Sequence, residues 1–169
     1  VGADLWLFDP ASGKTRRVDA RVNGPRTQRT RKFVPASRYL ETFDLHPEGH
    51  SLAVVARGGA FSLALWEGAG ARHGTASKVR HRLARWLRDG KRLVAVADGE
   101  GEGEGEEGLV VFTADGSAPP RHIAVDLGRP LEMVAAPAGA DRVAVANHRQ
   151  ELDVVDLGPG AAKTVERSE

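Results

Sequence analysis

Apolar and polar residues alternate along this chain in short runs separated by Gly-containing turns, a pattern typical of β-strands. Three segments share one plan: a strand, a tight polar turn, a second strand, a short connection and another apolar strand. They read "FDLHPEGHSLAVVARGGAFSLALW" (Phe43 to Trp66), "RWLRDGKRLVAVADGEGEGEGEEGLVVFT" (Arg85 to Thr113) and "VAAPAGADRVAVANHRQELDVVDL" (Val134 to Leu157). The turns "PEGH" and "RDGK" place Gly where a tight hairpin needs a positive φ. The sequence therefore predicts three copies of one antiparallel unit.

The spacing of the copies locates an insertion. The anchors Leu52, Leu93 and Val143 are 41 and 50 residues apart, and from each anchor to the next apolar strand the distance is 9, 16 and 9 residues. The middle copy thus has seven extra residues in one loop, where the chain runs Gly-Glu-Gly-Glu. A tract of this composition cannot bury enough apolar surface to fold, so we expect an acidic surface loop at residues 99–108.

A fourth, partial copy begins the chain. The stretch "LWLFDPASGKTRRV" (Leu5 to Val18) aligns with the second half of the unit as a strand, a turn and an outer strand. Units of about 40 to 45 residues with four strands each are typical of β-propeller blades. We therefore predict an all-β fold, a β-propeller fragment of about three and a half four-stranded blades.

Blade boundaries follow from the alignment of the copies. Residues 1–38 hold the second half of a blade plus a basic connection, 39–80 one blade, 81–126 a blade with the acidic Gly-Glu insertion at 99–108, and 127–169 a further blade, all in one partial propeller. In the first complete blade we expect an inner strand at Thr42 to Leu45, a second at Leu52 to Ala56 and a third at Phe61 to Trp66. We expect the next blade's outer strand around Pro120 to Val125.

The blade count is too small for a closed ring. Propellers close with about four to eight blades, and an open stack exposes sheet edges and apolar blade faces. We therefore expect the remaining blades to come from the same protein or from a second copy of this chain.

Charge is balanced overall but clustered locally. Lys plus Arg number 24 against 23 acidic residues, and the net charge of +1 gives no general reason to bind nucleic acid or an anionic membrane. The segment from Arg21 to Arg38 is basic, which we interpret as a solvated connection between strands or as a patch that meets acidic residues on a neighbouring surface. The chain has no Cys, which fits a reducing cytosol, and no apolar run approaches the ~18 residues of a membrane span. We expect a cytoplasmic protein that binds neither nucleic acid nor membrane.

Two short stretches resemble cofactor-binding motifs, but the residues around them do not fit a cofactor site. Gly103, Gly105 and Gly108 match G-x-G-x-x-G, but a strand follows instead of the required helix, and the surrounding Glu residues would repel a phosphate. The "ASGKT" stretch lacks the Gly that a phosphate-binding loop needs five residues before Gly13, where Phe8 stands, so it reads as a hairpin turn. Six scattered His residues form no spaced ligand set, and no Ser lies in a G-x-S-x-G elbow. We expect no cofactor, no metal and no catalytic residue in this chain.

Three stretches of the repeats resemble a known protein family. The stretch "RYLETFDLHPEGHSLAVVARGGAFSLALWEGAGARHG", with "WLRDGKRLVAVAD" and "DRVAVANHRQELDVVDL", resembles the propeller region of the tricorn protease family, specifically the seven-bladed propeller of its actinobacterial branch. The combination of Y-L-x-x-F-D-L-x-P-x-G with A-R-G and W-E-G is more specific than a generic WD40-like repeat, whereas the individual turns are not.

The resemblance implies part of a large, homo-oligomeric, cytoplasmic serine peptidase that trims oligopeptides, with propellers that guide peptides toward a catalytic chamber. The family's catalytic Ser and His lie in later domains, so no catalytic residue is carried over. The implied partners are oligopeptides and the remaining blades and catalytic domains of the same protein. A stand-alone interaction scaffold and the gating propeller of a prolyl-oligopeptidase-type enzyme remain alternatives.

Four polar residues are candidates for contact with a peptide. Arg57, Asp98, His148 and Arg149 occupy equivalent places after the second strand of three blades, so we expect them at the channel or rim of the propeller. The alternative interpretation is that they are ordinary solvent-exposed loop residues.

Overall fold

The computed structural model describes residues 5–18, 35–74, 79–98, 107–137 and 140–168. The chain divides into two units, Val1–Val34 and Pro35–Glu169, which are described separately. Most of the predicted basic stretch from Arg21 to Arg38 and the Gly-Glu run at 99–106 lie outside the described residues.

The smaller unit contains a β-hairpin, as the sequence predicts. Strand β1 (Leu5–Asp9) pairs antiparallel with β2 (Lys14–Val18). The Asp9 carboxylate closes the turn by accepting hydrogen bonds from the Ala11 N–H at 3.0 Å and the Ser12 hydroxyl at 2.5 Å. Gly13 follows with a φ of 64°. The "ASGKT" stretch is therefore a hairpin turn.

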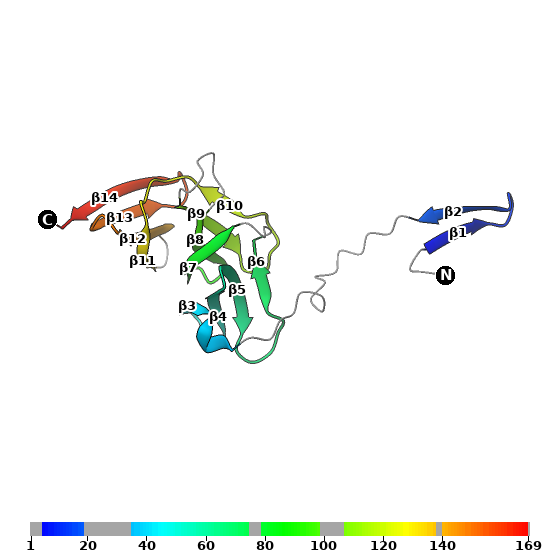
Figure 1. The fold of residues 1–169 in the computed structure, drawn as a ribbon, viewed down its shortest axis with the longest axis horizontal. Coiled ribbons are helices and arrows are strands. Elements are labelled where there is room, and N and C mark those ends of the chain that lie inside the picture. The colour runs from blue at the N-terminus through cyan, green and yellow to red at the C-terminus, as the bar shows by residue number, and fades with distance from the viewer. Residues whose placement is uncertain (1–4, 19–34, 75–78, 99–106, 138–139, 169) are drawn as a thin grey trace. The chain divides into compact units, whose positions relative to one another are not determined.

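Three four-stranded antiparallel sheets form the larger unit after a short 3-10 turn, η1 (Ala36–Arg38) (Figure 1). The first sheet contains β3 (Leu40–Leu45), β4 (Ser51–Ala56), β5 (Gly59–Ala64) and β6 (Ala71–His73). The second contains β7 (Arg80–Trp86), β8 (Arg92–Asp98), β9 (Glu107–Thr113) and β10 (Arg121–Ile123). The third contains β11 (Pro130–Ala135), β12 (Arg142–Asn147), β13 (Glu151–Asp156) and β14 (Ala161–Arg167). In each sheet the strands pair in chain order, which confirms the predicted propeller-blade fold.

Several strand limits differ from the prediction. The third strand of the first sheet ends at Ala64, and Trp66 lies beyond it with 77% of its surface exposed. Strand β9 begins at Glu107, which pairs with Asp98, so the last two residues of the predicted insertion belong to a strand. A run of Gly and Glu gives no local signal for this boundary, which pairing with β8 sets.

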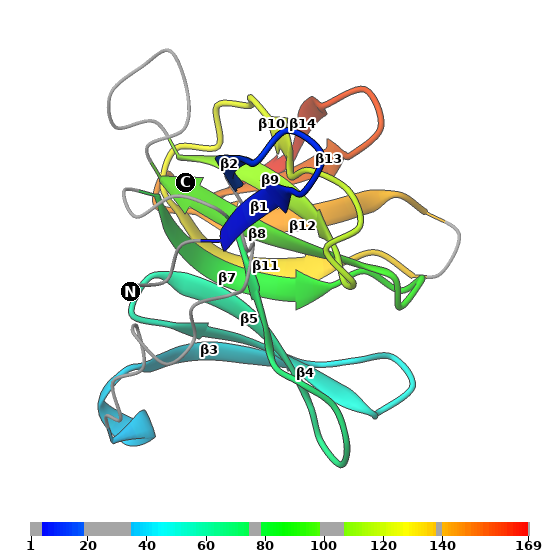
Figure 2. The same cartoon turned by 90° about the vertical axis from the view of Figure 1, so that its right-hand side faces the viewer.

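Burial explains the strand composition. The second sheet lies between the other two (Figure 2), and β8 is buried on both faces. Leu93 and Ala95 of β8 pack in the core shared with the first sheet, and Val94 and Val96 in the core shared with the third. The outer sheets bury one face only, which gives the alternating pattern of β4 and β13. Fully burying a Val or Leu side chain contributes about 1.5–3 kcal/mol, so these two cores hold the unit together.

The first and third sheets each leave an apolar face open. On the first sheet, Phe43 pairs with Val54, and Val54 with Phe61, so these three side chains share the face opposite the buried Val55. Phe43 is 64% exposed. On the third sheet, Val134 pairs with Ala144 across the corresponding outer face, and Val134 is 55% exposed. Such faces are buried between neighbouring blades inside this unit, so both ends have the surface of an unfinished stack.

The first strand of each sheet carries a β-bulge, and two arginines of the second sheet bind the backbone of β11 in the third sheet. The bulges lie between Leu40 and Thr42, between Arg82 and Arg85, and between Pro130 and Glu132. Arg85 Nε donates to the Met133 carbonyl at 2.8 Å, and Arg82 donates to the Pro130 carbonyl at 3.1 Å. These bonds occupy edge groups that would otherwise be open to another strand.

Candidate functional site

The candidate site is a pocket of about 410 Å³ between the second and third sheets. Its walls come from the facing ends of β8 and β9, the loop between β10 and β11, and the turn between β12 and β13. Its lining residues are Asp98, Glu107, Val125, Asp126, Gly128, Arg129, His148 and Arg149.

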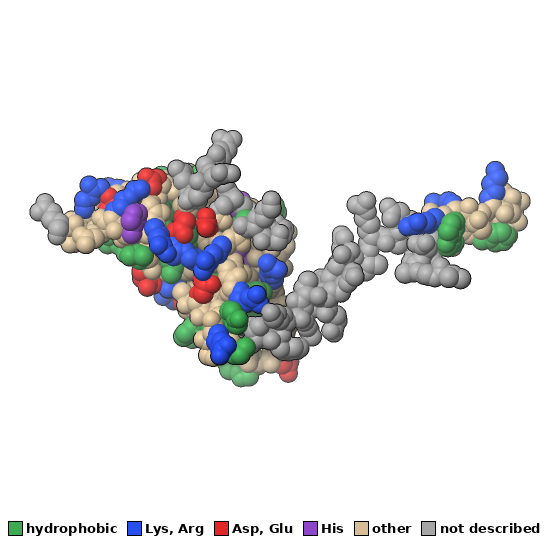
Figure 3. Space-filling model, in the orientation of Figure 1, with side chains coloured by type: hydrophobic (Ala, Val, Ile, Leu, Met, Phe, Trp, Pro, Cys, Tyr) green, Lys and Arg blue, Asp and Glu red, His purple; other side chains and the backbone are tan. Residues whose placement is uncertain are grey.

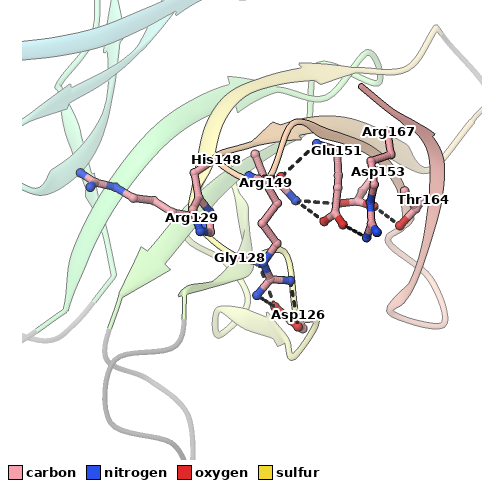
Figure 4. Close-up of polar contacts among 10 residues, drawn as sticks. Asp126, Gly128, Arg129, His148, Arg149, Glu151, Asp153, Thr164 and Arg167 are labelled. Carbon is pink, nitrogen blue, oxygen red and sulfur yellow. Dashed lines mark hydrogen bonds and ion pairs between the residues drawn. The ribbon is translucent and has the colours of Figure 1, made fainter. Parts of the chain in front are cut away.

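A buried asparagine shapes the turn that carries His148 and Arg149 (Figure 4). Asn147 Oδ1 accepts the backbone N–H of Arg149 at 2.8 Å and that of Glu151 at 3.2 Å. Gln150, between them, has a φ of 61°, a left-handed conformation that Asn and Gly adopt more readily than Gln. The hydrogen bonds of Asn147 offset this strain and fix the two cationic side chains at the end of the third sheet.

A polar network joins this turn to β13 and β14. The Asn147 side-chain amide donates to Glu151 at 3.0 Å and to Asp153 at 3.2 Å. Thr164 donates to Asp153 at 2.7 Å, and Arg167 pairs with Glu151 (Figure 4). The hydrogen bond from Asn147, followed by the one from Arg167, lowers the pKa of Glu151 below its usual value. Both acids are buried, and this network gives their carboxylates hydrogen-bond partners.

An ion pair joins the two loops that form one wall. Both Arg149 η-nitrogens contact the Asp126 carboxylate, at 3.3 and 3.2 Å, and the Gly128 N–H donates to Asp126 at 2.9 Å. The Gly128 hydrogen bond, and then Arg149, hold the pKa of Asp126 below its ordinary range, while Asp126 raises the pKa of Arg149. Arg149 thus fixes the loop around Gly128 instead of facing the pocket as an unpaired charge.

Backbone contacts orient the imidazole of His148. The Arg129 N–H donates to His148 Nδ1 at 2.9 Å, and the His148 N–H donates to the Arg129 carbonyl at 3.0 Å. Because Nδ1 accepts a hydrogen bond, the neutral ring carries its proton on Nε2. His148 is therefore a hydrogen-bond donor at the pocket wall.

Two charges in the pocket have no partner. Glu107 is held by Arg82 at 2.5 to 3.1 Å, and Asp126 by Arg149. Within the part of the chain that the structure describes, the side chains of Asp98 and Arg129 form no hydrogen bond or ion pair. The pocket therefore presents one available carboxylate, one available guanidinium and one N–H donor. On the face of this unit that Figure 3 shows, acidic and basic side chains lie next to one another.

The structure brings together three of the four predicted site residues. Asp98, His148 and Arg149 line the pocket, and Arg57 is not among its lining residues. The Arg57 guanidinium instead lies over the Tyr39 ring, 5.1 Å from its centroid, in a cation–π contact. Sequence analysis missed Arg129, which follows the turn Asp126 to Gly128. An Asp-x-Gly turn after an outer strand was the available signal, although nothing local marked it as close to His148.

One cluster of potential metal ligands occurs in the described ranges. His46, Glu48 and His50 lie in one turn, with ligand atoms within 4.8 Å of one another. Both ring nitrogens of His46 are already bonded, Nε2 to the Gly90 carbonyl at 2.8 Å and Nδ1 to the Glu48 N–H at 3.1 Å. His46 therefore closes its own turn and links the first two sheets.

Among the described residues, no helix has the length and apolar character to cross a membrane.

The chain is similar in sequence to several known proteins. No family model matches the chain. The chain is 36% identical to tricorn protease homolog 2 of Streptomyces coelicolor over 91% of its length, and 33% identical to tricorn protease homolog 1 of the same organism over 98%. It is 26% identical to the tricorn protease homolog of Saccharolobus solfataricus over 98%. The chain spans only 13 to 16% of the length of these curated relatives.

Solved structures show the same fold. A tricorn protease crystal structure aligns with 98% of this chain at a TM-score of 0.66 and 21% identity, using 15% of its own length. A TolB-like protein from Agrobacterium tumefaciens aligns with 97% at 0.60 and 12% identity, using 53% of its own length. The WD40 repeats of RRP9 align with 75% at 0.57 and 11% identity, using 38%. These matches confirm the resemblance predicted from the sequence: the chain belongs to the tricorn protease family and corresponds to a β-propeller segment of those longer proteins.

Proposed function

We propose that this chain is a non-catalytic propeller segment of a tricorn-like serine peptidase and that it guides oligopeptides toward a catalytic chamber formed elsewhere in the protein. The observation that carries the proposal is the sequence match to tricorn protease homologues over nearly the whole chain. A cytoplasmic location and a homo-oligomeric assembly, both implied by that family, form part of the same proposal.

The exposed apolar faces support the proposal that this chain is a segment of a larger propeller. Phe43 and Val134 lie exposed on the two ends of the stack, whereas comparable apolar faces inside it are covered by the next sheet. Further blades of the same protein would bury these residues. The blade boundaries at residues 39–80, 81–126 and 127–169 remain our assignment for this segment.

The chemistry of the described residues supports a non-catalytic role. Ser62 and His73 form a serine–histidine hydrogen bond at 2.9 Å, on the adjacent strands β5 and β6. In the described part of the chain no carboxylate bonds to His73, which is buried against Phe112. A nucleophilic serine needs an accessible base that is itself oriented by a third group, so this pair fits a structural cross-strand bond.

The test uses the full-length protein that contains this segment. We expect the double substitution Arg57→Ala and Arg149→Ala to change kcat/KM for peptides of about ten residues and to leave a dipeptide reporter substrate unaffected, because only long peptides depend on guidance. Arg72→Ala, in an exposed position on β6, is the matched control. Unchanged rates for both substrate lengths would overturn the proposed function.

A further inference from the structure

The pocket between the second and third sheets leaves two opposite charges available for a ligand. Asp98 reaches it from the end of β8, and Arg129 from the loop that leads into β11. Every other charged side chain of the lining set is already engaged, in the pairs Arg82–Glu107 and Arg149–Asp126. The unused binding capacity of the pocket is therefore one carboxylate and one guanidinium.

These two charges belong to different walls. Asp98 is part of the second sheet, whereas Arg129 and His148 belong to the loop and turn of the third sheet. His148 adds an N–H donor to the same wall, and its Nδ1 accepts the Arg129 backbone N–H at 2.9 Å, while the Arg129 side chain extends away from the ring (Figure 4). The third-sheet wall thus suits an anion, and a guanidinium binds a carboxylate with two parallel hydrogen bonds. The second-sheet wall suits an ammonium group.

The anion-binding wall is held together by contacts among its own residues. Gly128 has a φ of 54°, and a Cβ placed on it would lie 2.9 Å from His148 and 3.1 Å from Arg149. The backbone therefore packs directly against the two side chains, and the Arg149–Asp126 pair holds the loop in this position. A wall formed in advance loses less conformational entropy on binding.

We propose that this pocket binds short zwitterionic peptides, with the peptide amine on Asp98 and the peptide carboxylate on Arg129. A volume of about 410 Å³ accommodates a di- or tripeptide and lies within the usual range for small-ligand sites. The inference rests on the proposed function, since it identifies short peptides as ligands of a segment that we place in a peptide path. It also goes further, because guidance alone requires no discrete site for free peptide ends.

Calorimetry with matched peptides tests this assignment. The full-length protein, blocked with a serine-directed covalent inhibitor so that no peptide is cleaved, is titrated with Ala-Ala-Ala, its N-acetyl form and its C-terminal amide. The free tripeptide is expected to bind at least about tenfold more tightly than either blocked form, the usual effect of one charge-assisted hydrogen bond.

Substitutions of Asp98 and Arg129 test which residue binds each end of the peptide. Asp98→Asn is expected to weaken the free tripeptide about tenfold and to leave the N-acetyl form unchanged, whereas Arg129→Gln should weaken the free and N-acetyl forms and leave the amide unchanged. Arg88→Gln, an exposed arginine outside the pocket, is the control and should change nothing. Equal affinity of the wild type and both pocket variants for the free tripeptide, or equal binding of all three peptides to the wild type, would overturn the assignment.

The result of the peptide-binding experiment can be distinguished from the result of the cleavage experiment that tests the proposed function. Loss of oligopeptide guidance in the Arg57 and Arg149 double variant, with no dependence of tripeptide binding on Asp98 and Arg129, rejects the pocket and keeps the function. Tripeptide binding that depends on both residues, with unchanged cleavage rates in the double variant, supports the pocket and rejects the guidance role.

Discussion

The Asp44 carboxylate accepts a hydrogen bond from the Trp86 backbone N–H at 2.7 Å and thereby joins the first strand of one sheet to the first strand of the next. Close by, His46 contacts the edge of the Trp86 ring, with centroids 4.6 Å apart. Trp86 pairs in register with Leu93 of β8, and β7 is the edge strand of its sheet, so no strand lies on its other side to accept an outward N–H. Asp44 therefore supplies the partner that an edge strand lacks.

Replacing Asp44 with Ala should destabilise the larger unit. We expect a loss of about 1–3 kcal/mol, the usual cost of leaving a partly buried donor without a partner. Asp44→Asn keeps an acceptor oxygen and should cost less. Urea unfolding followed by Trp fluorescence measures both, with Glu67→Ala, at an exposed position, as the control. Equal stability of wild type and Asp44→Ala would show that the bond carries no net stability.

The Arg82–Glu107 ion pair should contribute more than a surface pair. Both side chains are largely buried, at 19% and 15% exposure, and Arg82 also binds the Pro130 carbonyl of the next sheet. Removing one partner leaves the other charge poorly solvated, so we expect Glu107→Gln and Arg82→Met each to cost about 1–3 kcal/mol. The double variant should cost less than the sum of the two, and a double-mutant cycle measures that coupling. Strict additivity would contradict it.

Stability should fall as the pH drops below about 6.5, partly through His73. Burial, with a smaller contribution from the nearby His81, lowers the pKa of His73 in the folded protein. The unfolded chain, with an ordinary His pKa of about 6.5, therefore binds a proton at a pH where the folded chain does not. This favours unfolding progressively below that pH, and above it both states are neutral.

His73→Gln should reduce this pH dependence. Unfolding free energies at pH 7.5 and 5.5 measure the change, and His50→Gln, an exposed histidine, is the control for general acid effects. An identical loss of stability between the two pH values in wild type and His73→Gln would contradict the assignment to His73.

The repeat could be predicted from the sequence because each blade is built from local signals. Turn glycines and the spacing of anchors such as Leu52 and Leu93 report on hairpins, and hairpins follow from neighbouring residues. The pocket depends on distant residues. Asp98, Arg129 and His148 meet only because the second and third sheets stack, and no local pattern shows that Glu107 and Asp126 are already paired. The same limit applies to Arg57, whose stacking on Tyr39 depends on the fold.

Gly128 offers the sharpest test of how the pocket wall is built. Gly128→Ala should cost more stability than Gly116→Ala, although both glycines have positive φ values, 54° and 68°. An added Cβ at Gly116 meets no atom within 4 Å, so that variant reports backbone strain alone, about 1–2 kcal/mol. At Gly128 the Cβ also displaces the His148 ring and the Arg149 guanidinium, so we expect roughly a further 1–3 kcal/mol, the typical cost of overpacking. Chemical denaturation of both variants measures the difference. Equal losses would mean that the two side chains move aside freely and that the wall is not formed in advance.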